Sequence, residues 1–240
     1  MIHFFEQLTS SNDEARDARY AEGDIIVVEH QSAGRGQRGH SWESQRGLNL
    51  TLSAVFEPTF LPPMQQFLIS EAVALAVVDT LHSFGIEAKI KWTNDIYVGD
   101  KKIAGILIEH KLQGNSLGRT IAGIGLNVNQ IAFSPELPNP TSMQLEGGRE
   151  FSRDEVLETL ADRLSARYSE LRDSDTKSLQ NDYHQLLFRR DEMHPFALPD
   201  GSLINGIIRG VEPTGALVIE DEEQKCRAFL FKEIEFVLKK

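Results

Sequence analysis

The sequence has a single cysteine, Cys226, in 240 residues. This excludes an internal disulfide framework and any zinc site built from several cysteines. No apolar run approaches the roughly 20 residues that a membrane-spanning helix needs. The first residues, Met-Ile-His-Phe-Phe-Glu, show neither the charged start nor the apolar core of a signal peptide. These absences predict a cytoplasmic protein that does not contact a membrane.

Positive charge and aromatic side chains are also scarce. The 25 lysines and arginines are outnumbered by 36 aspartates and glutamates, which gives a formal net charge of -11. Such a balance argues against non-specific binding to nucleic acid, because affinity for polyphosphate grows with the number of cations presented. The sequence also lacks a P-loop and a His/Cys metal spacing, and its Gly-Asn-Ser-Leu-Gly at 114–118 falls at an expected turn between two strands and not at a strand-to-helix elbow. Hydrolase and zinc-enzyme readings therefore have little support.

Against this background, two short stretches concentrate cations and glycines. Residues 31–42 read Gln-Ser-Ala-Gly-Arg-Gly-Gln-Arg-Gly-His-Ser-Trp and follow an apolar, strand-like run at 25–28. Glycine lets the backbone approach a ligand closely, and two guanidiniums in such a loop favour a lid that orders around an anion. The alternative is an exposed basic loop or a small RNA-binding arginine-glycine box. Residues 91–95, Lys-Trp-Thr-Asn-Asp, place a second cation at the end of another strand-like run.

The pattern of apolar residues predicts an α+β fold, in which a mixed, mainly antiparallel sheet is flanked by helices. A small β-barrel follows at the C-terminus. Ser152 and Gly85 are expected to cap helices, and Ser11 with Glu14 to form a capping box. The expected strands are 2–8, 25–28, 47–56, 86–92, 96–98, 103–109 and 119–129, the helices 64–84, 151–171 and 177–188, and the barrel strands 204–211, 216–220, 225–231 and 234–238.

Two further features allow both a structural and a functional interpretation. The hydroxyl and amide side chains of residues 9–12 can cap a helix, and they can also hold a polar ligand. Gly105, Gly123 and Gly125 weaken strands unless something lies close to the sheet. They indicate either bulges and strand packing or a flat ligand across adjacent strands, for which Gly105 and Gly123 would leave room. Asn127 ends its strand with an amide suited to phosphate or metal-bound water.

Four motifs in order resemble the biotin–protein ligase family and cover residues from about 8 to 130. They are Gly-Arg-Gly-Gln-Arg-Gly-His-Ser-Trp at 34–42, Lys-Trp-Thr-Asn-Asp-Ile-Tyr at 91–97, Lys-Ile-Ala-Gly-Ile-Leu-Ile-Glu at 102–109 and Gly-Ile-Gly-Leu-Asn-Val-Asn at 123–129. The resemblance implies a class II synthetase-like biotin/lipoate ligase domain at 1–192 and a Src-homology-type β-barrel domain at 193–240.

The resemblance also implies a reaction and a set of residues. Biotin and ATP, with Mg, would give biotinyl-5′-AMP and pyrophosphate, and a carrier lysine would then displace AMP. The implied catalytic residues are Lys91 and Arg35. The implied biotin contacts are Ser10, Ser11, Asn12, Gln31, Gly34, Arg35, Gly36, Gln37, Lys91, Gly105 and Gly123. The implied contacts to ATP or the adenylate are Arg35, Arg38, Trp42, Lys91, Asn94 and Asn127, with Mg held through the phosphates near Asn127.

The chain departs from the family pattern at three positions. Gln37 stands where arginine is frequent, Thr93 where proline is usual, and Ser11 where threonine is common. The first strand and the ligand motif begin at once, so we expect no winged-helix domain and no DNA binding. The implied partner is the biotin carboxyl carrier domain of a carboxylase, and the enzyme is expected to be a monomer or a homodimer.

Two rival functions remain at this point. A lipoate or octanoate ligase or transferase resembles the same fold and also modifies a carrier lysine. A non-catalytic module that binds single-stranded nucleic acid through its loop and small barrel is more distant, and the acidic net charge opposes it.

Overall fold

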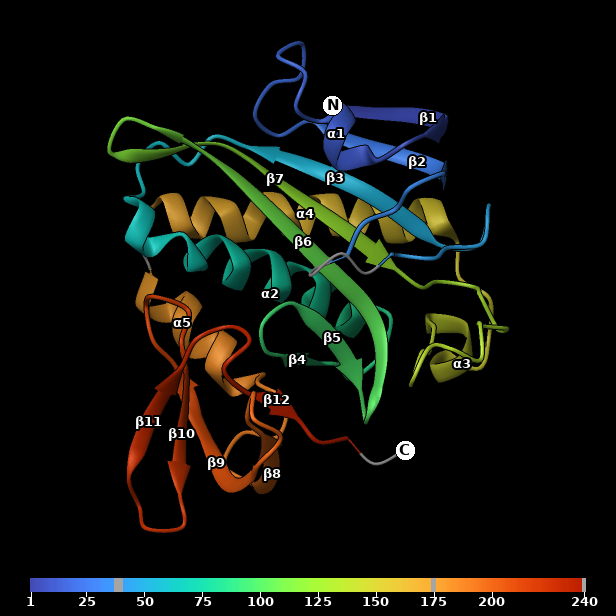
Figure 1. The fold of residues 1–240 in the computed structure, drawn as a ribbon. Coiled ribbons are helices and arrows are strands. Elements are labelled where there is room, and N and C mark those ends of the chain that lie inside the picture. The colour runs from blue at the N-terminus through green and yellow to red at the C-terminus, as the bar shows by residue number, and fades with distance from the viewer. Residues whose placement is uncertain (37–40, 174–175, 239–240) are drawn as a thin grey trace.

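The larger part of the molecule is a seven-stranded mixed sheet (Figure 1). The computed structural model describes residues 1–36, 41–173 and 176–238. Only the first two strands pair in parallel, and each of the other pairings is antiparallel. Across the sheet the strands are β1 (Ile2–Leu8), β2 (Ile25–Gln31), β3 (Leu50–Phe56), β7 (Ser116–Leu126), β6 (Lys101–Gln113), β5 (Asp95–Val98) and β4 (Lys89–Lys91).

Two helices, α2 (Phe67–Ser83) and α4 (Arg153–Arg172), cover one face of this sheet (Figure 1). The helical segment Pro63–Ser83, which contains α2, is long and apolar enough to cross a membrane by composition, but most of it is buried in the core. The predicted caps are confirmed: Ser152 Oγ accepts from the Glu155 N–H at 3.3 Å, and Gly85 adopts φ +77° after α2.

The other face of the sheet holds the polar side chains. On β3, Leu50, Leu52 and Ala54 belong to the core cluster that includes α2, so Thr51 and Ser53 point to the opposite face. By the same alternation on β7, Ile124 faces the helices while Gly123 and Gly125 face away. The sequence therefore builds one apolar face for packing and one polar face for a site.

Three short helices and one turn of 3₁₀ helix complete this part. They are α1 (Ser11–Glu14), η2 (Pro63–Gln65), α3 (Met143–Gly147) and α5 (Thr176–Gln185). The expected capping box from Ser11 is wrong: Ser10 is the N-cap residue, and its side chain makes no capping bond. Ser11 is instead a buried residue in the first turn of the helix, and its hydroxyl group contacts another side chain. The sequence patterns gave no sign of α3 or of the separate strand β8.

The C-terminal part is a five-stranded antiparallel sheet, which is consistent with the small C-terminal β-domain expected from the strand spacing. Figure 1 shows it beside α5 and near the β4–β5 edge of the large sheet. Trp92 anchors it there, because its indole Nε1–H donates to the Gly215 carbonyl at 2.9 Å. In order across the sheet the strands are β11 (Cys226–Phe229), β10 (Leu217–Asp221), β9 (Leu203–Val211), β8 (Met193–Ala197) and β12 (Glu235–Phe236).

Candidate active site

A cavity of about 360 Å³ lies on the polar face of the large sheet. Helix α1, the described residues of the loop at 31–42 (the glycine loop) and strands β3 to β7 surround it. Strand β12 of the C-terminal sheet closes one side. Segments that are distant in the sequence meet there. The site residues predicted from the sequence that line it are Ser10, Ser11, Asn12, Gln31, Arg35, Gly36, Trp42, Lys91, Asn94, Gly105 and Gly123.

One end of the cavity is a cluster of hydroxyl and amide groups. Ser53 Oγ lies 2.6 Å from Asn12 Oδ1 and 2.8 Å from Ser11 Oγ. The Asn12 Nδ2–H donates to Glu109 Oε2 at 2.9 Å, and the Ser11 N–H donates to Gln31 Oε1 at 2.6 Å. Ser10, Ser11, Asn12 and Ser53 are each at most 5% exposed. This end is therefore pre-organised to hydrogen-bond a compact polar group.

The glycines of β6 and β7 make room for side chains of the site. A Cβ on Gly123 would overlap the amide of Asn12, and one on Gly125 would overlap the indole of Trp42. A Cβ on Gly105 would lie 3.0 Å from the same indole. The expectation that Gly105 and Gly123 leave space for the ligand itself needs this correction, although both line the cavity. Their immediate neighbours are the side chains that shape the ligand site.

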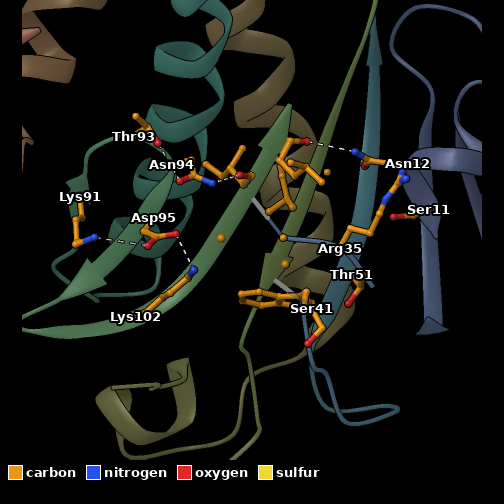
Figure 2. A pocket seen from close by; sticks show the side chains of 18 of the residues that line it. Ser11, Asn12, Arg35, Ser41, Thr51, Lys91, Thr93, Asn94, Asp95 and Lys102 are labelled. Carbon is orange, nitrogen blue, oxygen red and sulfur yellow. Dashed lines mark hydrogen bonds and ion pairs between the residues drawn. The ribbon is translucent and has the colours of Figure 1, made fainter. Parts of the chain in front are cut away.

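The other end of the cavity carries cations (Figure 2). Lys91 Nζ lies 3.9 Å from Asp95 Oδ2, and Lys102 Nζ lies 2.7 Å from Asp95 Oδ1. Burial lowers the pKa of Lys91, and the nearby charge of Lys102 acts in the same direction, while Asp95 and Glu235 oppose it. Lys91 also lies 4.8 Å from the ring centre of Phe236 on β12. The arrangement presents two ammonium groups, held by one carboxylate, to an anionic ligand.

Arg35 is turned toward carboxylates at the rim of the cavity. Its guanidinium lies 2.7 Å from Asp13 Oδ1 and 3.6 Å from Glu109 Oε2. Arg16 shares the same two partners, at 3.3 Å from Asp13 and 2.7 Å from Glu109. These pairs fix the start of the glycine loop next to the hydroxyl end. An anion in the cavity would have to compete with them for Arg35.

Several predicted residues do not line this cavity. Asn127 is 4% exposed, and its Nδ2–H donates to the Thr141 carbonyl at 2.9 Å, so it braces the segment after β7. Gly34 lies behind the lining, where its carbonyl accepts the Trp42 N–H at 3.0 Å. The predicted contacts of Gln37 and Arg38 lie outside the described residues.

Sequence reasoning missed other residues that line the cavity. Lys102 and Asp95 belong to the motifs but were not predicted as site residues. In sequence, a turn lysine and a strand aspartate look like solvent-exposed residues. The remaining missed members are Ser41, Thr51 and, from the C-terminal part, Phe231, Ile234, Glu235 and Phe236. No sequence signal could have connected residues 231–236 to the first half of the chain, because only the packing of the two sheets brings them to it.

Within the described ranges, no group of three or more His, Cys, Asp and Glu side chains could hold a metal ion. The charged side chains that line the cavity are those of Arg35, Lys91 and Lys102 and the carboxylates of Asp95 and Glu235.

Known proteins resemble this chain in both sequence and fold. The model of the biotin/lipoate A/B protein ligase family matches residues 4–129. The bifunctional ligase/repressor BirA of Bacillus spizizenii is 34% identical over 151 residues, 61% of this chain and 46% of that protein. The biotin–[acetyl-CoA-carboxylase] ligase of Paracoccus denitrificans is 30% identical over 204 residues, 81% of this chain and 82% of that protein.

A solved structure has the same architecture over the full length. The biotin protein ligase from Aquifex aeolicus in complex with biotin and ATP superposes with a TM-score of 0.83. That match covers 99% of both chains at 23% sequence identity. The predicted mixed sheet with flanking helices is thereby confirmed, together with a small C-terminal part.

Proposed function

The chain belongs to the biotin/lipoate A/B protein ligase family, and we propose that it attaches biotin to a lysine of a carrier domain in an ATP-dependent reaction. Biotinyl-5′-AMP is the proposed intermediate, and the carrier is the biotin carboxyl carrier domain of a carboxylase. The Paracoccus relative is a biotin–[acetyl-CoA-carboxylase] ligase, which supports the proposal. The activity is a proposal because the chain spans only 46% of the length of the Bacillus BirA relative.

The observation that carries the proposal is the division of one cavity into two ends. Ser11, Asn12 and Gln31 offer hydrogen bonds at one end, while Lys91 and Lys102 offer positive charge at the other (Figure 2). Biotin has the matching order of groups, with a polar ureido ring, an apolar chain and a carboxylate. A lipoyl or octanoyl group has no polar ring to satisfy the buried hydroxyl end, and unpaired buried polar groups cost about 1–3 kcal/mol each. The cavity therefore favours biotin over these acids.

In the first step, a carboxylate oxygen of biotin attacks the α-phosphorus of ATP, and the bond to the bridging oxygen breaks to release pyrophosphate. Two anions must approach each other, so the site must supply cations before the reaction begins. We propose that Lys91, whose side chain is 16% exposed, contacts both the carboxylate and the α-phosphate. Magnesium would enter with the ATP phosphates and reduce their charge further.

In the second step, the carrier lysine attacks the carbonyl of the mixed anhydride, an amide forms, and AMP leaves with the electron pair of the broken C–O bond. The nucleophile must be the neutral amine, so a proton is lost on the way. We assign Trp42 and Asn94 to the nucleotide side of the cavity, because both line it, the Trp42 ring centre lies 5.6 Å from Lys102 Nζ, and Asn94 directly precedes Asp95, the partner of both lysines. We keep Asn127 and Arg38 as predicted nucleotide contacts in the ligand-bound enzyme.

A direct test of the function is transfer to a carrier domain. The purified chain, with ATP, Mg and biotin, should biotinylate an isolated carrier domain but not its variant with arginine at the acceptor position. Equimolar lipoate or octanoate should not reduce the rate. Labelling of the carrier by lipoate or octanoate in preference to biotin would reject the proposed substrate.

The two neighbouring glycines of β7 give a matched pair of variants. Gly123→Ala displaces Asn12 and should raise KM for biotin, whereas Gly125→Ala displaces Trp42 and should raise KM for ATP. Each substitution should weaken the contacts to one ligand only. We expect the KM for that ligand to rise about tenfold, which corresponds to about 1.4 kcal/mol of lost binding free energy. Initial rates with one substrate varied at a time measure both constants. A rise of both constants in both variants would contradict the separate placement of the two ligands.

A further inference from the structure

Lys102 is the second lysine at the charged end of the cavity, beside Lys91. Its ammonium group lies 2.7 Å from Asp95 and 5.6 Å from the ring centre of Trp42. Figure 2 shows Lys102 and Lys91 on opposite sides of the Asp95 carboxylate. Lys102 thus lies between the reacting centre marked by Lys91 and the indole assigned to the nucleotide.

Strand pairing and hydrogen bonds hold the backbone of Lys102 on both sides. The position from which its side chain extends is therefore fixed. On one side it pairs with Tyr97 of β5. On the other, its N–H donates to the Asn139 carbonyl at 2.7 Å, and its carbonyl accepts the Thr141 N–H at 2.9 Å. A rigid attachment of this kind is what pre-organised charge stabilisation requires.

The two lysines differ in exposure in a way that separates their roles. The Lys91 side chain is 16% exposed and that of Lys102 is 32% exposed, although both pair with Asp95. Lys91 is therefore the inner cation, near the bond that forms. Lys102 is the outer cation, nearer the solvent into which a leaving group departs.

We propose that Lys102 binds the phosphate groups that leave as pyrophosphate and stabilises the charge that develops on them. The inference rests on the proposed function and adds a catalytic residue to it. As the bond between the α-phosphorus and the bridging oxygen breaks, its electron pair passes to that oxygen. The Lys102 ammonium neutralises this growing charge, and no proton, oxidant or further reactant is needed. Asp95 holds the ammonium in position before ATP binds.

The test compares two reactions of bound biotinyl-5′-AMP, one with pyrophosphate and one with the carrier domain. Wild-type and Lys102→Met enzymes are given synthetic biotinyl-5′-AMP together with either pyrophosphate or the carrier domain. We expect ATP formation from pyrophosphate to fall about 10²-fold in the variant, the usual effect of removing one charge-stabilising donor. Transfer to the carrier involves no pyrophosphate and should keep its wild-type rate. Lys102→Arg, which retains the charge, should recover part of the loss.

The matched control is Lys101→Met at the preceding position of β6. Lys101 Nζ pairs with Glu146 at 2.8 Å, is 56% exposed and does not line the cavity. Both reactions should be unaffected in this variant. Equal losses of ATP formation and transfer in Lys102→Met, or wild-type rates of both, would overturn the assignment of Lys102 alone. A wild-type enzyme that neither forms ATP from the adenylate nor transfers biotin would overturn the proposed function and the assignment with it.

Discussion

Replacing Lys91 with methionine is expected to slow biotinyl-5′-AMP formation about 10²- to 10³-fold, the usual range for one charge-stabilising group. Lys91 is the inner cation, and its loss leaves the carboxylate and the α-phosphate to approach each other without it. Methionine keeps the apolar stem against Phe236 and Tyr97, so the site should stay folded. Single-turnover formation of the adenylate from ATP and biotin measures the effect.

The control for this variant is Lys89→Met, two residues earlier on the same strand. Lys89 is exposed, and its ammonium lies 3.4 Å from the Gln185 carbonyl, away from the cavity. Its replacement should leave adenylate formation at the wild-type rate. A Lys91→Met enzyme as fast as Lys89→Met would show that Lys91 does not act at the reacting centre.

The pH dependence of the first step should report the same residue. Because burial lowers the pKa of Lys91, the protonated form is lost at a lower pH than for an ordinary lysine. Adenylate formation should therefore decline on the alkaline side before an exposed lysine would titrate. The profile of kcat/KM for biotin measures this, and the decline should be absent from the residual activity of Lys91→Met.

The second large effect concerns stability and arises far from the cavity. Glu71 of α2 is 0% exposed, and neither of its carboxylate oxygens has a hydrogen-bond partner among the residues that the structure describes. Burial raises the pKa of Glu71 to about 8. The hydroxyl of Tyr183 on α5 is buried without a partner as well, and the charge of Glu71 adds to the rise of its pKa. The carboxyl group is therefore neutral in the folded protein at neutral pH.

The raised pKa of Glu71 predicts how the free energy of unfolding changes with pH. The folded-state pKa of Glu71 is above its unfolded value near 4.5, so the folded state binds the proton more tightly. The resulting stabilisation is fully present below the unfolded pKa, declines as the pH rises, and has been lost once the pH has passed about 8. Urea unfolding on both sides of this range measures the decline in the free energy of unfolding.

Glu71→Met should remove that decline and raise the free energy of unfolding above pH 8 by more than about 1–3 kcal/mol, the cost of a neutral unsatisfied buried polar group, because the buried carboxyl is charged there. Methionine fills a similar volume without a charge. Glu158→Met, at an exposed position of α4, is the matched control and should keep the wild-type pH dependence. A Glu71→Met protein with the same pH dependence as the wild type would contradict this account.

Local sequence patterns were enough to predict the long elements, and the family resemblance supplied part of the residues that line the cavity. The apolar spacing of α2, the cap at Ser152 and the strand-like runs of the sheet depend on near neighbours, and each is confirmed. The motif residues Ser11, Trp42 and Lys91 meet in one cavity, as the resemblance implied.

The failures share one physical cause, which is that the decisive contact is distant in the sequence. The Ser11 hydroxyl pairs with Ser53 and so does not cap its own helix. Lys102 looks like an exposed turn residue until β5 and the segment at 139–141 fix it over the cavity. Packing between the two sheets brings Phe236 to Lys91.

The measurement that tests the central claim most directly is exchange of labelled pyrophosphate into ATP by the purified chain. The account predicts exchange that requires biotin, is not supported by lipoate or octanoate, and is lost in Lys91→Met. Exchange without biotin, exchange driven equally by lipoate, or no exchange by a folded protein would contradict the assignment of this cavity to biotin adenylation.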